Sequence, residues 1–579
     1  MIKRYFNFLV FFCLTNRANK FSSILFAAGG FLLACFDLLT ITFLAILTLY
    51  VIDDLEKFYV KADISNFISL ETLNSNLILI IFLFFLIKST YVFFLEKNKA
   101  KFISKCYENF QKILFLNFFN SKYNLYKSYD KSFVTKQLIY TPERTFVALM
   151  EGTFALITEI SVFLLIISFL FFATNNEVLL GASFAFICYF FVFLFIKKQI
   201  KKFSTNFNDS TTDLFQNVND FFNGYREIII FDKIISFKGI YNKYLLNYTK
   251  NWTSLRFILN YSKNLNELLI ILLVILMLLF GKNSEFIKSD VDFTLAAFLI
   301  SIIRLYPNFT KIQNTLHLIN TTIPQSKELK DFFNNLSLNP RNKNLNKLDD
   351  LTINYENIEL KLENISFKYK DSIILSDINI NSKNNKKYFI FGKSGAGKST
   401  LLDIILGLID DYNGKILLNN HPIDYEKTYN RGNVMGFIPQ TKFLINDSIF
   451  NNVTLYEELN TENLNKVIKC LQQVDLGNLV NEKDITKYQI GADGNKLSGG
   501  QAQRILLARI LYFDPKIMIF DEPTSNLDEG TEKFFIKNLV QQAKDKIIIY
   551  VSHNLSYISE FDEVYCLKNN KLNKYEKNS

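Results

Sequence analysis

Hydrophobic and polar positions divide the chain into two parts with different patterns. Up to about position 305 long apolar runs dominate, whereas beyond about position 354 short apolar stretches alternate with polar ones. A helix needs about 20 apolar residues to cross a bilayer, and most of six runs in the first part reach that length. The runs are Phe21–Val51, Leu77–Leu95, Thr153–Ala173, Val178–Ile196, Glu267–Gly281 and Phe293–Leu305. The last two are short, and we expect them to extend into their polar flanks, so the pattern predicts an α-helical membrane domain of six transmembrane helices.

Charged residues between these runs predict the orientation. The connection Ile52–Asn76 is net acidic and Thr174–Glu177 has no Lys or Arg, whereas Glu96–Gly152 and Lys197–Asn266 are rich in lysine beside the membrane ends. The positive-inside rule therefore places both termini and the two long connections in the cytoplasm, in a multi-pass protein of the inner (cytoplasmic) membrane.

The two long connections keep apolar residues three and four apart, which indicates helices. We expect the transmembrane helices to continue into the cytoplasm and to turn there in short crossing helices that press on the second domain. The candidates for these turns are Thr135–Glu143 and Asn219–Glu227.

The stretch Met1–Leu14 resembles a signal peptide, because basic residues precede an apolar segment. It has no small-residue cleavage site, and the following residues Asn16–Lys20 are polar and basic. We therefore expect an interfacial helix on the cytoplasmic side.

Several ionisable residues fall inside or at the ends of the apolar runs: Asp37, Lys88, Glu159, Lys263, Glu267 and Arg304. A charge at the bilayer centre costs about 3 kcal/mol, so such residues usually face a cavity or one another. Lys88 and Lys263 have the alternative of reaching the interface with their long side chains. We expect Arg304 to face an internal cavity, where these three cations from each of two subunits would suit an anionic cargo such as a phosphate group.

Composition agrees with this division. The chain of 579 residues is too long for one domain. With 49% hydrophobic residues, 60 Phe and only 21% charged residues it is apolar for a soluble enzyme, which the long apolar runs explain. The six cysteines show no metal-ligand or redox spacing, which favours reduced thiols. The polar stretch from 326 to 353 predicts a linker between a transmembrane domain (1–325) and a second domain (354–579).

A glycine-rich segment, Phe391–Thr400, fits the pattern G-x-x-x-x-G-K-[ST] between the strand-like Lys387–Phe391 and the helical pattern of Leu401–Leu408. This context predicts an α/β P-loop NTPase domain, in which backbone N–H groups cradle a triphosphate. Lys398 would bind the β- and γ-phosphates and Ser399 would bind Mg²⁺. The expected ATP contacts are Gly392, Lys393, Ser394, Gly395, Ala396, Gly397, Lys398, Ser399 and Thr400.

Two further motifs belong to the same chemistry. Ser498, Gly499, Gly500 and Gln501 open the predicted helix Ala502–Leu511, and small residues at a helix start form an anion site. The apolar strand Ile517–Asp521 would deliver Asp521 to the phosphate loop to hold Mg²⁺. Glu522, the next residue, would orient or deprotonate the attacking water.

Three single residues are weaker candidates. Gln440 follows the stretch GFIP, from which it could reach Mg²⁺ or the attacking water. His553 ends the strand-like segment Ile547–His553, where it is either a γ-phosphate contact or a core histidine. Tyr369 ends the strand-like segment Leu360–Tyr369, where it either stacks on adenine or is an ordinary strand tyrosine.

These motifs together, GKSGAGKST, the loop ending in Gln440, LSGGQAQR, IFDEPTSNLD and the SH of His553, resemble an ATP-binding-cassette (ABC) nucleotide domain. With six preceding spans the chain resembles an ABC half-transporter of the exporter type. The resemblance implies that ATP is sandwiched between the phosphate loop of one subunit and the LSGGQ of the other. It also implies that Gln440, Glu522 and His553 act in hydrolysis, that Tyr369 stacks on adenine, and that a homodimer forms, because the chain carries one full set of motifs.

A narrower resemblance is to bacterial lipid-linked oligosaccharide flippases of the PglK-like type. Arg304–Pro307, RLYP, resembles the R-L-x-P of their last span, and Lys88 and Lys263 fall where such flippases carry arginines. Lysine cannot bind a phosphate bidentately, which is a departure from that pattern. Two alternatives stay open: a drug, lipid or peptide exporter of the same fold, and a non-transporting ABC protein, against which six spans argue. The expected partners are a second half-transporter, membrane lipid and an amphiphilic substrate, with no nucleic acid.

Overall fold

The computed structural model describes residues 20–51, 70–173, 176–281, 293–338, 358–370, 372–423, 434–482, 484–524, 529–541 and 544–576. The predicted N-terminal interfacial helix and the last four residues of the motif IFDEPTSNLD, Ser525–Asp528, lie outside these residues. The chain forms two compact units, which we describe separately. One comprises Met1–Ser121 and Ser128–Asn339, and the other comprises Lys122–Lys127 and Pro340–Ser579.

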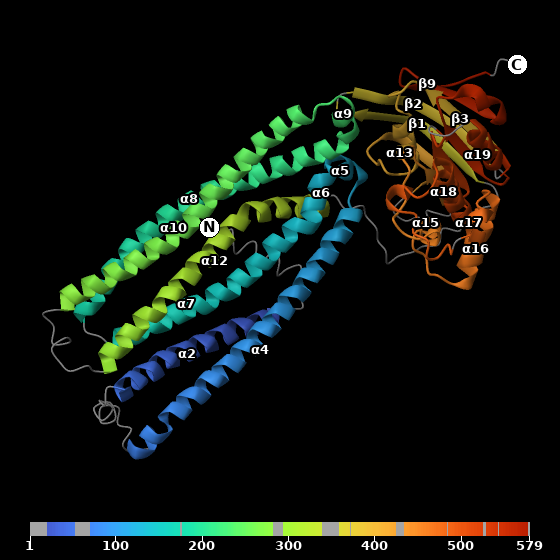
Figure 1. Cartoon of the computed structure of the whole chain (residues 1–579). Coiled ribbons are helices and arrows are strands. Elements are labelled where there is room, and N and C mark those ends of the chain that lie inside the picture. Colours follow the sequence, from blue (N-terminus) through green and yellow to red (C-terminus); the bar gives the residue numbers. More distant parts are fainter. Residues whose placement is uncertain are drawn as a thin grey trace. The chain divides into compact units, whose positions relative to one another are not determined.

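Long helices make up the first unit, and each of the six predicted runs lies in one of them (Figure 1). These helices are α2 (Lys20–Val51), α4 (Leu70–Phe119), α7 (Ala148–Ala173), α8 (Asn176–Asn223), α10 (Ile234–Gly281) and α12 (Phe293–Leu338). Among the described residues, three helical stretches are long and apolar enough to cross a membrane: Phe21–Thr48, Leu77–Phe119 and Lys131–Phe169. Most side chains of the other three predicted runs lie outside the described part, where only the helical backbone is seen.

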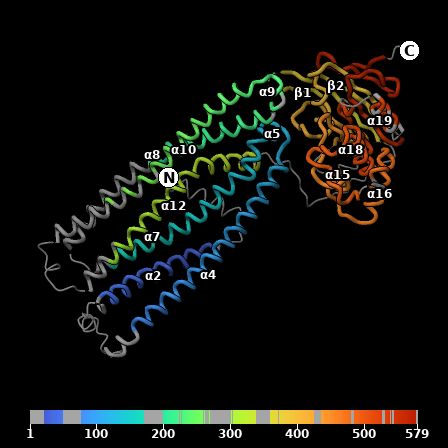
Figure 2. Tube along the Cα trace, viewed as in Figure 1, coloured from blue at the N-terminus to red at the C-terminus, as the bar shows by residue number. Residues whose placement is uncertain are grey.

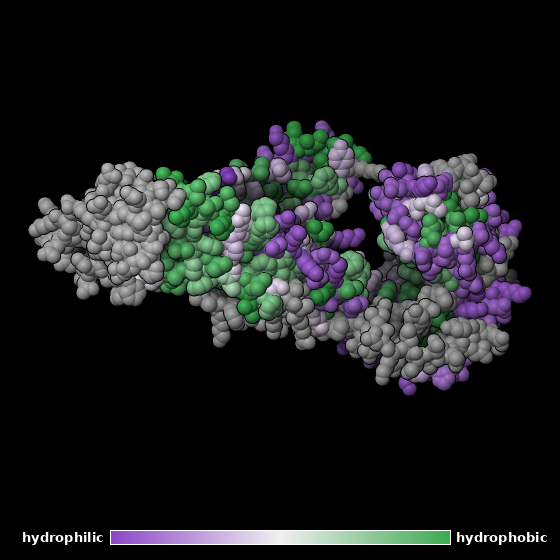
Figure 3. Space-filling model, turned by 90° about the horizontal axis from the view of Figure 1, so that it is seen from below, coloured by the Kyte–Doolittle hydropathy of each residue, from purple (hydrophilic) through white to green (hydrophobic). Residues whose placement is uncertain are grey.

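The helices pack lengthwise, α8 against α10, and α7 against both α2 and α12 (Figure 2). Ala34 and Ile41 of α2 are buried against Val162 and Ile166 of α7. The two helices approach closely at Gly30, where an added Cβ would lie 2.4 Å from the hydroxyl oxygen of Thr158. On the face that Figure 3 shows, the part of this unit next to the grey atoms is mostly green, and exposed apolar side chains such as Phe82 and Phe93 of α4 are what lipid contact requires.

Several helices are much longer than a membrane crossing, as expected from the long connections. Helices α4, α8, α10 and α12 have 50, 48, 48 and 46 residues. At about 1.5 Å per residue each is more than twice the length that crosses the hydrocarbon layer. Helix α12 continues to Leu338, beyond the residues where the polar pattern suggested the start of a linker.

The first crossing helix is α5 (Tyr123–Ser128), so the prediction of a turn at Thr135–Glu143 is wrong. The chain is helical from Lys131 onward through α6 (Lys131–Thr135), η3 (Lys136–Tyr140) and η4 (Glu143–Val147) into α7. Asp130 adopts an extended conformation that starts a new helix, whereas residues buried at helical spacing continue that helix through the predicted turn: Val134, Gln137, Thr141 and Thr145.

The second crossing helix, α9 (Tyr225–Ile230), follows the break at Gly224 and overlaps the predicted range Asn219–Glu227. Helix α8 ends just before this glycine, and α10 begins at Ile234. The sequence pattern therefore located this turn to within a few residues.

The second unit has two sheets and confirms the predicted P-loop NTPase class. A four-stranded antiparallel sheet has the order β2-β1-β4-β5, and a six-stranded sheet the order β10-β9-β3-β8-β7-β6. The strands of the first sheet are β1 (Glu359–Tyr369), β2 (Ser372–Lys383), β4 (Asn413–Leu418) and β5 (His421–Pro422). Those of the second are β3 (Lys386–Gly392), β6 (Met435–Ile438), β7 (Ile517–Asp521), β8 (Ile547–Val551), β9 (Glu563–Lys568) and β10 (Lys571–Lys574).

The helices of this unit are α13 (Lys398–Ile405), α15 (Ile449–Thr454), α16 (Thr461–Gln473), α17 (Gly477–Glu482), η5 (Ala492–Gly494), α18 (Gly499–Phe513), α19 (Glu529–Gln541) and η6 (Leu555–Glu560). All five residues of β7 and of β8 are buried. Ile517 and Ile519 pack with the helix α13, whereas Met518 and Phe520 pack with α18 and α19 on the other face. Burial on both faces explains why these strands are continuous apolar runs. Because β3, β7 and β8 are parallel and in register, their carboxyl ends meet at one edge.

The segment Lys122–Lys127 belongs to the second unit through its contacts. Lys127 forms an ion pair of 2.8 Å with Asp403 on α13, and Lys122 one of 2.9 Å with Asp410. The Lys127 ammonium also lies 4.9 Å from the ring centroid of Tyr123. Through these contacts most of α5 belongs to the sheet-bearing unit, although its neighbours α4 and α6 in the chain belong to the helical unit.

Candidate functional site

The phosphate loop connects β3 to α13, and its glycines meet local steric demands. At Gly392 a Cβ would lie 2.5 Å from the carbonyl oxygen of Leu567 on the neighbouring strand. Gly397 has a φ of +100°, in the left-handed region, and a Cβ there would lie 2.9 Å from Ile374. The loop therefore keeps its shape only with glycine at both positions.

Lys398 is the first residue of α13 and is buried. Its ammonium donates to the carbonyl oxygens of Gly392, at 2.9 Å, and of Lys393, at 3.2 Å. It lies 3.7 Å from the Glu522 carboxylate. These contacts fold the lysine over the loop, so that its charge sits where the motif predicts a phosphate.

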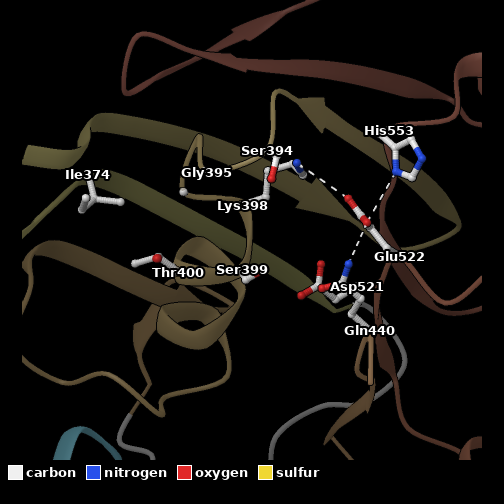
Figure 4. A pocket seen from close by; sticks show the side chains of 11 residues that line it. Ile374, Ser394, Gly395, Lys398, Ser399, Thr400, Gln440, Asp521, Glu522 and His553 are labelled. Carbon is white, nitrogen blue, oxygen red and sulfur yellow. Dashed lines mark hydrogen bonds and ion pairs between the residues drawn. The ribbon is translucent and has the colours of Figure 1, made fainter. Parts of the chain in front are cut away.

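Glu522 is the centre of the polar contacts (Figure 4). The Gln440 amide donates to its carboxylate at 3.0 Å, and Nδ1 of His553 lies 3.4 Å from the same oxygen. Its own φ is +46°, a conformation that costs a non-glycine residue about 1–3 kcal/mol, and its N–H donates to the carbonyl oxygen of Val551 at 2.8 Å. The structure thus brings the three predicted catalytic residues together, with backbone strain at the central one.

Asp521 ends β7 and is buried. Burial raises the pKa of this carboxyl, and the negative charge of Glu522 adds to the increase, while a hydrogen bond with the Ser399 side chain opposes it. Hydroxyl, carboxylate and amide oxygens from Ser399, Asp521 and Gln440 are the hard donors that Mg²⁺ prefers. No group of three or more His, Cys, Asp or Glu side chains that could hold a metal occurs among the described residues.

These side chains line one pocket, together with several backbone positions of the loop (Figure 4). Its lining is Ile374, Ser394, Gly395, Gly397, Lys398, Ser399, Thr400, Gln440, Asp521, Glu522 and His553. The sequence analysis missed Ile374, which comes from β2. The alternation of apolar and polar residues in Ser372–Lys383 is the signal that would have indicated this strand.

Other predicted site residues lie outside this lining. Tyr369 is at the end of β1 with 41% of its surface exposed, and its ring packs edge-on against Phe367. Ser498 is the N-cap of α18 and forms a reciprocal capping box with Gln501. The Lys442 ammonium donates to the carbonyl oxygen of Gly499 at 3.1 Å. Within one chain, the residues of the LSGGQ motif do not meet the phosphate-loop pocket.

In the helical unit, the predicted cations Lys88 and Arg304 converge on one carboxylate. Lys88 lies 2.7 Å from Oδ1 of Asp37, and a guanidinium N–H of Arg304 bonds to the same oxygen. The Lys263 side chain lies outside the described residues. The sequence analysis named Asp37 as an ionisable residue within a span but did not identify it as the partner of both cations.

Comparison with known proteins agrees with this architecture. Residues 375–525 match the ABC transporter family model. The fold is similar to that of a bacterial Atm1-family ABC exporter with ATP bound, with a TM-score of 0.76 and 18% identity over 96% of each chain. The chain therefore has the fold of an ABC exporter half, and its C-terminal unit contains an ABC ATPase domain.

Curated relatives match over a shorter length. The multidrug resistance-like ATP-binding protein MdlB of Buchnera aphidicola is 36% identical over 37% of this chain and 37% of its own. The alpha-hemolysin translocation ATP-binding protein HlyB of Escherichia coli is 33% identical over 38% of this chain and 32% of its own. A probable ABC transporter ATP-binding/permease protein of Haemophilus influenzae is 28% identical over 51% of this chain and 53% of its own. The matches thus span about a third to a half of the length of these relatives.

Proposed function

We propose that two copies of this chain form an ATP-hydrolysing exporter or flippase that moves an anionic amphiphile across the cytoplasmic membrane. The observation that carries this proposal is the meeting of Glu522, Gln440, His553 and Lys398 at one pocket. The same chain supplies helices long and apolar enough to span a bilayer. Hydrolysis in the second unit would drive a change in the first.

The pocket residues divide the chemistry among them. ATP would lie along the phosphate loop, with its phosphates on Lys398 and the backbone N–H groups. Ser399, Asp521 and Gln440 would hold Mg²⁺, which supplies neutralisation of phosphate charge. Glu522 would accept a proton from, or orient, the attacking water, and His553 would contact the γ-phosphate. The hydrogen bond from Gln440 to Glu522 positions the carboxylate at the pocket, and Tyr369 would stack on adenine.

A two-chain assembly would complete the ATP site. Ser498, Gly499, Gly500 and Gln501 start a helix of 15 residues, whose N-terminus attracts anions, yet they do not line the pocket of their own chain. An apolar surface around α9 supports the same assembly, because Phe222, Ile230 and Ile235 are 75%, 75% and 85% exposed. Exposed apolar patches of this kind mark interaction sites.

The cargo is proposed from the cations of the helical unit. Lys88 and Arg304 lie inside predicted spans, where charge usually serves function. With Lys263 they would form a cationic site for a phosphate-bearing amphiphile, and a lipid-linked (pyrophosphate) oligosaccharide is the specific cargo that we propose. The alternative is a multidrug exporter, since a relative at 36% identity is named multidrug resistance-like. Stimulation of ATP hydrolysis by farnesyl phosphate, and not by a cationic amphiphile such as dodecyltrimethylammonium, would favour the phosphate-bearing cargo. The opposite result would favour the multidrug exporter.

The variant Glu522→Gln tests the ATPase assignment. In lipid nanodiscs we expect it to bind Mg-ATP, to accumulate as a closed two-chain form and to hydrolyse ATP at least about a hundredfold more slowly, since general-base catalysis contributes about 10²–10⁴-fold. Glu563→Gln is the matched control, because that carboxylate pairs with Lys386 and Lys574 and does not line the pocket. Hydrolysis by the Glu522 variant at the control rate would remove the assignment.

A further inference from the structure

Asp37 of α2 is a buried carboxylate that joins three helices of the first unit. Its side chain is 9% exposed, and its Oδ1 accepts from Lys88 on α4 at 2.7 Å and from Arg304 on α12. Lys88 also donates to the hydroxyl of Thr40, one turn along α2, at 2.7 Å. These partners are separated by 51 and 267 positions in the sequence, so the cluster is a product of helix packing.

The charges of this cluster do not cancel. Among the described side chains, two cations share one carboxylate, which leaves one positive charge in excess near the middle of the span Phe21–Thr48. An ion pair that only ties helices together in a low-dielectric region is most favourable when it is neutral and fully paired. A further anion would therefore stabilise this cluster by neutralising the excess positive charge.

Arg304 is where that anion can reach the cluster. Its side chain is 38% exposed, compared with 14% for Lys88, and in the described part of the chain it forms one ion pair, through Nη2. A guanidinium has five N–H donors in a plane and binds phosphate oxygens bidentately. A phosphate can thus approach from the open side of Arg304, on the same cations that Asp37 holds.

A second polar cluster on α12 provides a comparison. Asn308 and Lys311 both contact Glu159 of α7, at 2.6 Å and 3.1 Å. Here one cation meets one carboxylate, so the charges balance, and Lys311 is 62% exposed. Glu159 ties α7 to α12 as Asp37 ties α2 to α12, without an excess cation.

We propose that Asp37 is an internal counter-ion, which holds Lys88 and Arg304 in the cargo-free protein and is replaced there by the phosphate of an anionic amphiphile. This inference rests on the proposed function and adds to it the group that competes with cargo. An internal partner lowers the apparent affinity of a ligand in proportion to the fraction of molecules in which the site is blocked. Asp37 thereby sets cargo affinity, and its release from α4 and α12 links cargo binding to movement of these helices.

The test uses the full-length protein in nanodiscs of zwitterionic lipid, with ADP release as the readout and farnesyl phosphate as the probe. Farnesol and inorganic phosphate control for the tail and for free anion. We expect Asp37→Asn to lower the half-maximal concentration of farnesyl phosphate about tenfold, which corresponds to a site blocked about nine-tenths of the time. Asp37→Glu, which keeps the charge, and Glu159→Gln, which makes the same chemical change at the balanced cluster, should leave it at the wild-type value.

A wild-type measurement covers the case in which Asp37→Asn does not fold. Dicyclohexylcarbodiimide is an apolar reagent that modifies accessible carboxyl groups, and two bound cations shield the carboxylate of Asp37 from it. We expect farnesyl phosphate, but not farnesol, to increase the labelling of Asp37 severalfold in the wild-type protein.

The outcomes separate the inference from the function. Suppose that farnesyl phosphate stimulates the wild type, but that Asp37→Asn responds at the same concentration or that labelling of Asp37 does not change. Asp37 then only holds the helices together, so the inference is wrong while the proposed function stands. If inorganic phosphate acts as well as farnesyl phosphate, the site takes free anion and the amphiphile is not its ligand. If farnesyl phosphate does not stimulate the wild type beyond farnesol, both the proposed cargo and the inference fail.

Discussion

The ion pair between Lys127 and Asp403 should couple the crossing helix α5 to the nucleotide pocket. Asp403 lies on α13, the helix that begins with Lys398 and Ser399, and Lys127 lies on α5, between α4 and α6 in the chain. Burial lowers the pKa of Lys127, but the hydrogen bond and charge of Asp403 outweigh it, so the pKa lies above its ordinary value. Lys127 is therefore fully charged at neutral pH.

The coupling energy between Lys127 and Asp403 can be estimated from how exposed the two side chains are. Asp403 is 12% exposed and Lys127 46%, so the pair is stronger than an exposed one, which contributes about 0.2–1 kcal/mol, and weaker than a buried one. The position of Lys127 over the Tyr123 ring adds about 0.5 kcal/mol. We expect a coupling energy near 1 kcal/mol, or about fivefold.

The assay is a double-mutant cycle with Lys127→Ala, Asp403→Asn and the double variant in nanodiscs. For each protein the ratio of cargo-stimulated to basal ATP hydrolysis is measured. We expect each single change to lower this ratio about fivefold, and the double variant to be no worse than either single one. Lys122→Ala is the matched control. Its pair with Asp410 is 46% and 54% exposed, so its effect should stay below about twofold.

Additive effects in the cycle would refute this reasoning, because additivity means that the two side chains do not act through each other. An effect of Lys122→Ala as large as that of Lys127→Ala would also refute it, since general loss of positive charge on α5 would then explain the result.

Three further predictions concern the nucleotide domain. Gly397→Ala should weaken binding of a fluorescent ATP analogue at least about tenfold. An alanine at a left-handed φ of +100° costs about 1–3 kcal/mol, and its Cβ would contact Ile374. Unchanged binding would contradict this account of the loop. Removal of Mg²⁺ with EDTA should abolish hydrolysis in the wild type, and readdition should restore it, whereas hydrolysis that persists would show that the oxygen donors beside Asp521 hold no ion. Arg509 is half-buried and donates to the carbonyl oxygens of Asn452 and Phe443, so Arg509→Met should lower the free energy of unfolding by about 1–3 kcal/mol; a thermal midpoint equal to that of the wild type would contradict it.

Local patterns predicted the elements of this protein well. The strand of residues 517–521 was predicted with the bounds that β7 has, because an uninterrupted apolar run fits a strand buried on both faces. The six apolar runs predicted six helices, since period and length are properties of the run itself. The phosphate loop was also predicted from the sequence, because its glycines form a fixed pattern within a few residues.

The turn at α5 shows where local pattern failed. The stretch Thr135–Glu143 is polar enough to suggest a connection, yet it stays helical because Gln137 and Thr141 are buried by packing. Burial is decided by neighbouring helices, and their positions are absent from the sequence.

The sequence by itself determined which residues are candidates for the chemistry: the phosphate loop, Asp521 and Glu522, Gln440, His553, and charges within the apolar runs. Only the tertiary structure decided which of them meet. Gln440 reaches Glu522 across 82 positions, Lys127 reaches Asp403 across 276, and Arg304 reaches Asp37 across 267. Such pairs depend on strand register and on the rotation of each helix about its axis. A change of one residue in register or about 100° in rotation would separate the partners without altering a single local pattern.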